Sequence, residues 1–150
     1  MATTVNNTNV NSRLTIVFDA AGQLDGDGPA KGTGNTQSDV YIDDKTHQNL
    51  RSHTEVDASV HALQWNASTN TGEIEYTDSR ANDSISSIPQ WATNVVIRCE
   101  AEDTWQSTYD STYAGHSDAG AEDDSAAITA AKTAADTART DYHTANSITY

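Results

Sequence analysis

The segment 61–76 constrains the fold most, because it alternates apolar and polar side chains in two short runs joined by a polar loop. In the first run Leu63 and Trp65 fall on one face, and in the second run Ile74 and Tyr76 share a face. This pattern predicts an antiparallel hairpin closed by the polar loop. Packing of Trp65 against Ile74 or Tyr76 across the two strands is expected to be its main stabilising contact.

Two further strands are expected before the hairpin. Arg13–Phe18 brings β-branched and aromatic residues together, and Ser38–Ile42 is a second short run of the same kind. Residues 1–12 are rich in Asn and Thr and predict a flexible polar tail. Residues 19–35 contain five of the eight glycines and predict a long loop.

After Pro89 the spacing of apolar residues changes from two to nearer four, which is the period of a helix. Ser87 and Pro89 supply a start signal for a helix expected over residues 89–113. One face of this helix collects Trp91, Val95, Cys99, Glu102, Trp105, Tyr109 and Tyr113. The place of Cys99 on that face predicts a buried structural thiol rather than a reactive one.

A second, alanine-rich helix is expected over residues 119–143, after Gly115 and Gly120 separate it from the first. Its first turn is expected to contain the acidic residues 122–124, where negative charge favours the helix dipole. Small side chains allow another helix to approach closely but bury little area, so this helix requires a partner. The partner is either the first helix, in a hairpin, or a second copy of the chain through self-association.

The order of these elements predicts an α+β fold, with a small antiparallel β domain followed by a C-terminal two-helix region. The expected organisation is a tail over residues 1–12, a β-rich domain over 13–86 and a helical region over 87–150. Only 35% of the residues are hydrophobic, which indicates a small core.

The net charge of −14, from 22 acidic and 8 basic residues, argues against nucleic acid as a partner, because phosphate binding depends on Lys and Arg. The same charge opposes binding to an anionic membrane surface. Neither a signal peptide nor a membrane span is expected, since no segment has the required apolar run. The single cysteine excludes an intrachain disulfide framework and a multi-thiolate metal site.

Patterns typical of catalytic or metal sites are weak in this chain. The segment Asp25–Gly28 lacks the ligand spacing of an EF-hand, so a solvated turn is favoured over a calcium site. Glu73 and Glu75 share the strand face opposite Ile74, so they are expected to face water rather than act as an acid–base pair. Metal-ligand spacing is also absent from the five histidines, which are expected at the surface: His47, His53, His61, His116 and His143.

The sequence contains no phosphate-binding loop of the Walker type and no nucleophile elbow. We therefore expect a protein that is not an enzyme and that has no cofactor and no bound metal.

Three short runs in the centre of the chain carry a family resemblance: His61–Trp65, Gly72–Tyr76 and Ile85–Trp91. Together they resemble a segment of small tailed-phage proteins associated with tail fibres, including tail-fibre assembly chaperones. The resemblance implies a non-enzymatic bacteriophage tail protein that binds a tail-fibre or baseplate component. Its expected location is the virion tail, or the host cytoplasm during assembly. A capsid or neck decoration protein with a purely structural role is the alternative.

Five aromatic residues are the candidate contacts for a partner protein: Trp65, Tyr76, Trp91, Trp105 and Tyr109. Aromatic side chains are enriched at protein interfaces, and an exposed aromatic patch marks such a surface. For Trp91 and Trp105 a place in the core is the alternative interpretation.

Overall fold

The computed structural model describes residues 13–18, 38–43, 45–49, 56–57 and 59–147. The predicted tail over residues 1–12 and the predicted loop over 19–35, with its Asp25–Gly28 segment, lie outside the described residues. The chain forms two compact units. The first contains the described residues up to Val96, and the second contains those from Ile97 onward.

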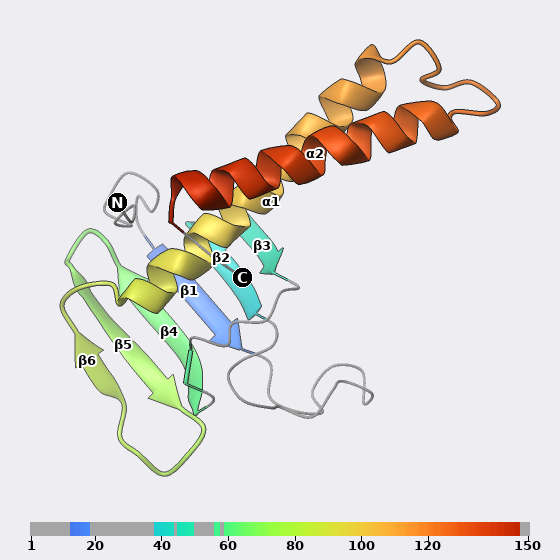
Figure 1. The fold of residues 1–150 in the computed structure, drawn as a ribbon. Coiled ribbons are helices and arrows are strands. Elements are labelled where there is room, and N and C mark those ends of the chain that lie inside the picture. Colours follow the sequence, from blue (N-terminus) through green and yellow to red (C-terminus); the bar gives the residue numbers. More distant parts are fainter. Residues whose placement is uncertain (1–12, 19–37, 44, 50–55, 58, 148–150) are drawn as a thin grey trace. The chain divides into compact units, whose positions relative to one another are not determined.

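Six strands form one antiparallel sheet in the first unit (Figure 1). Their order across the sheet is β3-β2-β1-β4-β5-β6. The strands are β1 (Arg13–Phe18), β2 (Ser38–Ile42), β3 (Lys45–Asn49), β4 (Val60–Asn66), β5 (Thr71–Tyr76) and β6 (Asp83–Ile85). Helices α1 (Gln90–Gly115) and α2 (Ser125–Ala145) follow along the chain. The predicted α+β fold, a small antiparallel β domain followed by two C-terminal helices, is confirmed.

Strands β1 and β2 coincide with the two strands predicted before the hairpin. The two edge strands, β3 and β6, were not predicted. Both are mainly polar in sequence and show no alternation of apolar and polar residues. Short polar edge strands limit pairing of the sheet with other chains. The same polarity removes the alternation by which a strand is recognised in a sequence.

The core of the first unit lies on one face of the sheet, because apolar residues alternate along the central strands. Ile16 of β1 is fully buried and lies opposite the equally buried Leu63 of β4. The ring of Trp91, at the start of α1, lies 5.8 Å from the ring of Phe18, so the first turn of α1 packs on this face. Full burial of each such aliphatic side chain stabilises the unit by about 1.5–3 kcal/mol.

The central hairpin forms as predicted, but its register differs from the expected contacts. Leu63 lies opposite Ile74, whereas Trp65 lies opposite Gly72. Trp65 is therefore a diagonal neighbour of Ile74 rather than its direct partner. The turn between β4 and β5 sets this register, and it includes Asn70 with a positive φ of 50°. Gly72 leaves room for the large indole beside it, since a Cβ at this position would lie 2.9 Å from Cε3 of Trp65.

Helix α1 begins one residue after the predicted start, whereas α2 begins at Ser125 rather than at residue 119. The acidic residues 122–124 therefore precede α2, and the prediction that they occupy its first turn is wrong. The chain turns instead through Gly120, whose φ of 75° suits a residue without a Cβ. Within the described part of the chain, no helix combines the length and the apolar content that crossing a membrane requires.

Candidate functional site

A groove of about 370 Å³ lies on the first unit and is lined mainly by polar side chains. Strand pairing places these side chains on the face of the sheet opposite the core, because they alternate with the buried residues. We call this feature the polar groove. Its polar lining residues are Arg13, Thr15, Gln64, Asn66, Thr71, Glu73 and Ser84.

The centre of the polar groove is one row of side chains across four strands. Thr15 of β1 lies opposite Gln64 of β4, which lies opposite Glu73 of β5, and Glu73 lies opposite Ser84 of β6. Tyr41 of β2 extends the row beyond Thr15 and is 39% exposed. Neighbouring strands are about 4.8 Å apart, so Tyr41 lies on the same face of the sheet as the groove, one strand beyond the residues that line it.

Two sets of hydrogen bonds hold the ends of the polar groove. The backbone N–H of Arg13 donates to Oδ1 of Asp43 at 3.2 Å, and the backbone N–H of Asp43 donates to the carbonyl of Arg13 at 2.7 Å. At the other end, Nδ2 of Asn82 donates to Oε1 of Glu73 at 3.2 Å. These bonds hold the backbone of Arg13, the single basic residue of the lining, and the carboxylate of Glu73, its single acidic residue.

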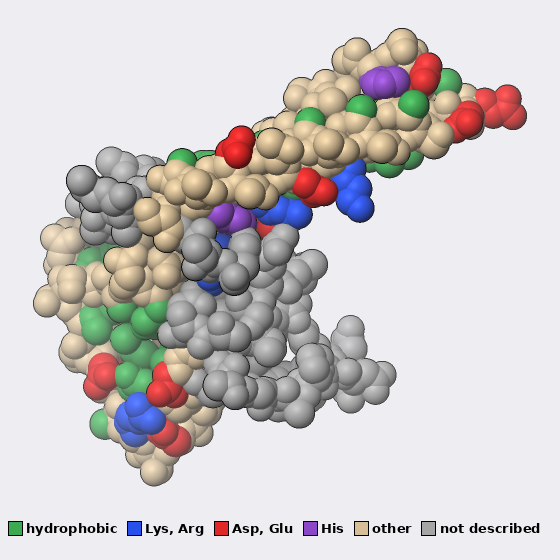
Figure 2. Space-filling view, in the orientation of Figure 1, with side chains coloured by type: hydrophobic (Ala, Val, Ile, Leu, Met, Phe, Trp, Pro, Cys, Tyr) green, Lys and Arg blue, Asp and Glu red, His purple; other side chains and the backbone are tan. Residues whose placement is uncertain are grey.

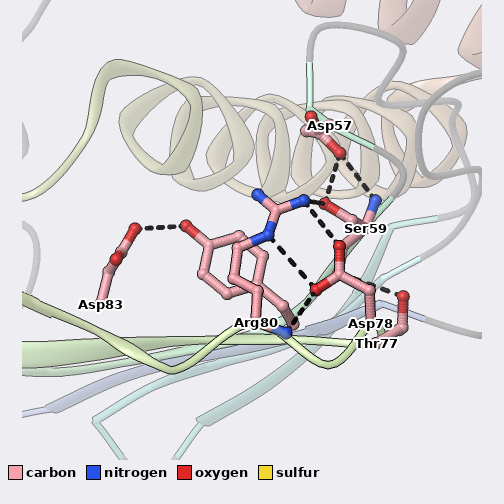
Figure 3. Close-up of polar contacts among 7 residues, drawn as sticks. Asp57, Ser59, Thr77, Asp78, Arg80 and Asp83 are labelled. Atoms are coloured by element: carbon pink, nitrogen blue, oxygen red, sulfur yellow. Dashed lines mark hydrogen bonds and ion pairs between the residues drawn. The ribbon is translucent and has the colours of Figure 1, made fainter.

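A second polar cluster on the first unit surrounds Arg80 (Figure 3). The guanidinium of Arg80 donates to Oδ2 of Asp78 at 2.7 Å and to Oγ of Ser59 at 3.1 Å. The hydrogen bond from the Arg80 side chain is the main cause that lowers the pKa of Asp78. Both side chains of this ion pair are about half exposed, so the pair is screened by solvent and contributes little to stability.

The Arg80 cluster also holds one of the predicted partner contacts. The guanidinium carbon of Arg80 lies 4.3 Å from the centroid of the Tyr76 ring, and the Tyr76 hydroxyl donates to Oδ2 of Asp83 at 2.5 Å. That hydrogen bond to Asp83 is the main cause that raises the pKa of Tyr76. Tyr76 therefore serves to join β5 and β6.

The second unit is an antiparallel hairpin of two helices held by polar contacts. Nε1 of Trp105 on α1 donates to Oδ1 of Asp136 on α2 at 2.8 Å. The guanidinium of Arg139 reaches both carboxylate oxygens of Glu102, at 3.1 and 3.3 Å. The hydroxyl of Tyr142 donates to the carboxylate of Glu100. We call the unit the helical hairpin.

Three aromatic rings of α1 form a ladder along the helical hairpin. The rings of Trp105 and Tyr109 are stacked with centroids 5.2 Å apart, and those of Tyr109 and Tyr113 are stacked with centroids 6.4 Å apart. The hydroxyl of Tyr113 donates to the carboxylate of Asp124, beyond the end of α1. All three rings are half-buried, so each retains exposed surface.

The face of α2 that the helical hairpin buries is made of small side chains: its buried residues are Ala127, Ala131, Ala135 and His143. Ile128, one position beyond the first of these, is 42% exposed. Among the residues that the structure describes, Ile128 and Tyr41 are the exposed large hydrophobic side chains. In the space-filling view, acidic side chains lie at the end of the helical hairpin where the loop joins α1 to α2 (Figure 2).

The predicted partner contacts fall into four environments. Trp65 is only 5% exposed and belongs to the core, so it offers little surface to a partner. Trp91 is half-buried against Phe18, and Tyr76 is held in the Arg80 cluster. Trp105 and Tyr109 lie together on the helical hairpin, separate from the others in the chain's division into units. The polar groove was missed, because its lining residues are scattered over four strands and contain no motif.

The thiol of Cys99 is buried. Burial raises the pKa of the Cys99 thiol to about 12, with further contributions from Asp103, Glu100 and Glu102, so the predicted inert thiol is supported. In the described ranges, no group of three or more His, Cys, Asp or Glu side chains is placed to hold a metal ion. The expectation of surface histidines is wrong for His143, which is 5% exposed.

The two other described histidines, His61 and His116, are half-buried, and the side chains of His47 and His53 lie outside the description. Nδ1 of His116 accepts a hydrogen bond from the backbone N–H of Asp118 at 3.1 Å, which gives this ring a role in the turn after α1. Glu73 and Glu75 share the face opposite the core, and Glu73 is exposed whereas Glu75 is half-buried.

Comparison of the chain with models of protein families, with curated proteins and with solved structures gives no match.

Proposed function

We propose that the chain is a non-enzymatic bacteriophage tail protein that binds a tail-fibre or baseplate component, with the helical hairpin as the element of association. The resemblance of the central runs supplies the class of protein, and the composition of the helical hairpin supports a role in binding.

The observation that carries the proposal is the small size of the side chains buried on α2. Three of its four buried residues are alanines, and each buries little apolar area. Helices in proteins gain most of their stability from tertiary packing of an apolar face. A two-helix hairpin that buries mainly alanines between its helices is therefore stabilised further when another protein covers it.

Ile128 and the aromatic ladder supply the exposed apolar area of the helical hairpin that a partner would cover. Ile128 is an exposed aliphatic side chain on an otherwise small and polar helix, and burial at an interface would remove it from water. Trp105 and Tyr109 contribute exposed aromatic area, which is enriched at protein interfaces. The same surface suits a second copy of the chain, so self-association and partner binding would compete for it.

Co-expression with candidate tail-fibre and baseplate proteins, followed by size-exclusion chromatography, tests the proposal. The wild-type chain is expected to elute with one of them. Ile128→Glu should weaken the complex by about tenfold or more, because a charge replaces an apolar side chain at the interface. Thr129→Glu is the matched control, since it adds the same charge at the adjacent exposed position. If the wild-type chain elutes with no tail protein, the proposal fails.

The decoration protein remains the second candidate, and its copy number in purified virions separates it from a tail accessory. A capsid decoration protein covers many equivalent positions, whereas a fibre-associated protein is limited by the number of fibres. Quantitative mass spectrometry against the major capsid protein measures this ratio.

A further inference from the structure

We infer that the polar groove of the sheet binds a neutral oligosaccharide through its side chains, with Tyr41 as a stacking platform. This site lies in the first unit and does not depend on the function proposed for the helical hairpin. Four properties of the groove support the inference: open hydrogen-bonding groups, balanced charge, an exposed ring one strand beyond the lining, and a position on the face of the sheet rather than at its edge.

The groove offers hydrogen-bonding groups that the protein itself leaves open. The side chains of Arg13, Thr15, Gln64 and Ser84 make no hydrogen bond or ion pair with another described residue. Between them they present guanidinium and amide donors, an amide acceptor, and hydroxyls that do both. A sugar hydroxyl also both donates and accepts, so a row of mixed groups matches a ligand with several hydroxyls.

The charge of the groove favours a neutral ligand. Its lining contains one basic residue, Arg13, and one acidic residue, Glu73, in a chain with a net charge of −14. An anionic ligand would be repelled by the field of the whole chain, and within the groove the charge of Arg13 is matched by the opposite charge of Glu73, so the lining itself selects neither sign. A neutral polyol brings no charge that must lose its water, so hydrogen bonds to the open side chains suffice to offset its desolvation.

Tyr41 supplies the apolar contact that hydrogen bonds alone lack. The ring is 39% exposed and lies one strand away from Thr15, at the end of the row that crosses the groove. An aromatic ring has an apolar face and, in tyrosine, a polar tip. The C–H face of a sugar ring can pack on the phenol while its hydroxyls reach the amide of Gln64 and the hydroxyl of Thr15.

The position of the groove distinguishes an oligosaccharide from an extended peptide. A peptide added to a sheet pairs with the open main chain of an edge strand. The polar groove instead crosses the face of β1, β4 and β5, whose main-chain groups are already paired on both sides. A ligand there must be recognised by side chains. The volume of about 370 Å³ falls near the lower end of the range for ligand sites, about 300–1,000 Å³.

The test uses the full chain on an array of neutral oligosaccharides of glucose, galactose, mannose and N-acetylhexosamines, printed beside sialylated, sulfated and phosphorylated glycans. Titration calorimetry with the best neutral glycan then compares variants. Tyr41→Ala and Gln64→Ala should each weaken binding by about tenfold, because each removes a separate contact. Tyr41→Phe should retain binding, since it keeps the ring. Gln106→Ala, the same change at an exposed position of α1, should leave binding unchanged.

The inference is supported if a neutral glycan binds and only the two groove variants lose it while they melt at the wild-type temperature. It is overturned if no neutral glycan binds, if only charged glycans bind, or if Tyr41→Ala and Gln64→Ala bind as well as the wild type. A loss of tail-protein binding in Gln64→Ala, without glycan binding by the wild type, would also overturn it and assign this face to a protein. Failure of the hairpin proposal is detected separately, through Ile128→Glu.

Discussion

Replacing Gly72 by alanine tests the packing of the central hairpin, because the surrounding atoms leave no room for a side chain there. A Cβ at this position would lie 2.4 Å from the carbonyl oxygen of Gln64, 2.9 Å from Cε3 of Trp65 and 3.2 Å from Cγ1 of Ile85. The first of these atoms belongs to the backbone of the neighbouring strand, so it cannot move away by a change of rotamer.

The cost of Gly72→Ala follows from the displacement that it requires. Overpacking of a well-packed site costs about 1–3 kcal/mol through shifts of backbone and side chains. The contact with a backbone carbonyl places this site near the middle of that range or above it, at about 2 kcal/mol. For a domain of about 60–100 residues, each 1 kcal/mol lowers the melting temperature by about 4–8 °C, so a decrease of about 8–16 °C is expected.

Thermal unfolding followed by tryptophan fluorescence and circular dichroism measures this decrease. Gly115→Ala is the matched control, because a Cβ there would have no atom within 4 Å. This control should leave the melting temperature unchanged or raise it slightly, since alanine favours a helix. If Gly72→Ala melts within about 1 °C of the wild type, the close packing of the two strands at this position is refuted.

Three further predictions concern the helical hairpin and the Arg80 cluster. Tyr142→Phe should destabilise the chain by about 1 kcal/mol in urea unfolding, because it removes the hydrogen bond to Glu100. Tyr109→Phe is the control and should have little effect, because the Tyr109 hydroxyl has no hydrogen-bond partner among the described residues. Burial and that bond to Glu100 raise the pKa of Tyr142. The contribution of Tyr142 to the free energy of unfolding is therefore present below the ordinary tyrosine pKa and declines as the pH rises through the raised pKa. Equal loss of stability at alkaline pH in the wild type and in Tyr142→Phe would contradict this. The pKa of Cys99 is raised to about 12, so its thiol should react slowly with Ellman's reagent at about pH 8 in the native chain and rapidly after unfolding. Rapid reaction in the native chain would show an accessible thiolate. Arg80→Gln should leave the melting temperature unchanged, because its ion pair is exposed, and a clear decrease would indicate a larger role.

The central elements could be predicted from the sequence because their residues are buried on one side. Alternation in β1 and in the hairpin strands predicted their positions, and the spacing from Trp91 to Tyr113 predicted α1. Every residue of the predicted α1 face is buried or half-buried. Burial on one side of a strand or helix produces a periodic spacing of apolar residues, and this spacing can be read from the sequence alone.

The polar edges, the turn before α2 and the polar groove could not be predicted in the same way. Strands β3 and β6 bury little, so no alternation selects them. The start of α2 depends on Gly120 and on the bond between Asp124 and Tyr113, which lie eleven residues apart. The groove depends on the register between β1 and β4, which places Thr15 opposite Gln64. That register cannot be predicted from composition alone.

Cross-linking mass spectrometry on assembled phage tails tests the proposed function most directly. Lys132 is exposed on α2, one helical turn from Ile128, so its amine reports on the surface that the partner is proposed to cover. The proposal predicts cross-links from Lys132 to a tail-fibre or baseplate protein in wild-type particles, and their loss with Ile128→Glu but not with Thr129→Glu. Absence of the chain from tails and from fibre-assembly intermediates, or cross-links from Lys132 to capsid proteins alone, would contradict it.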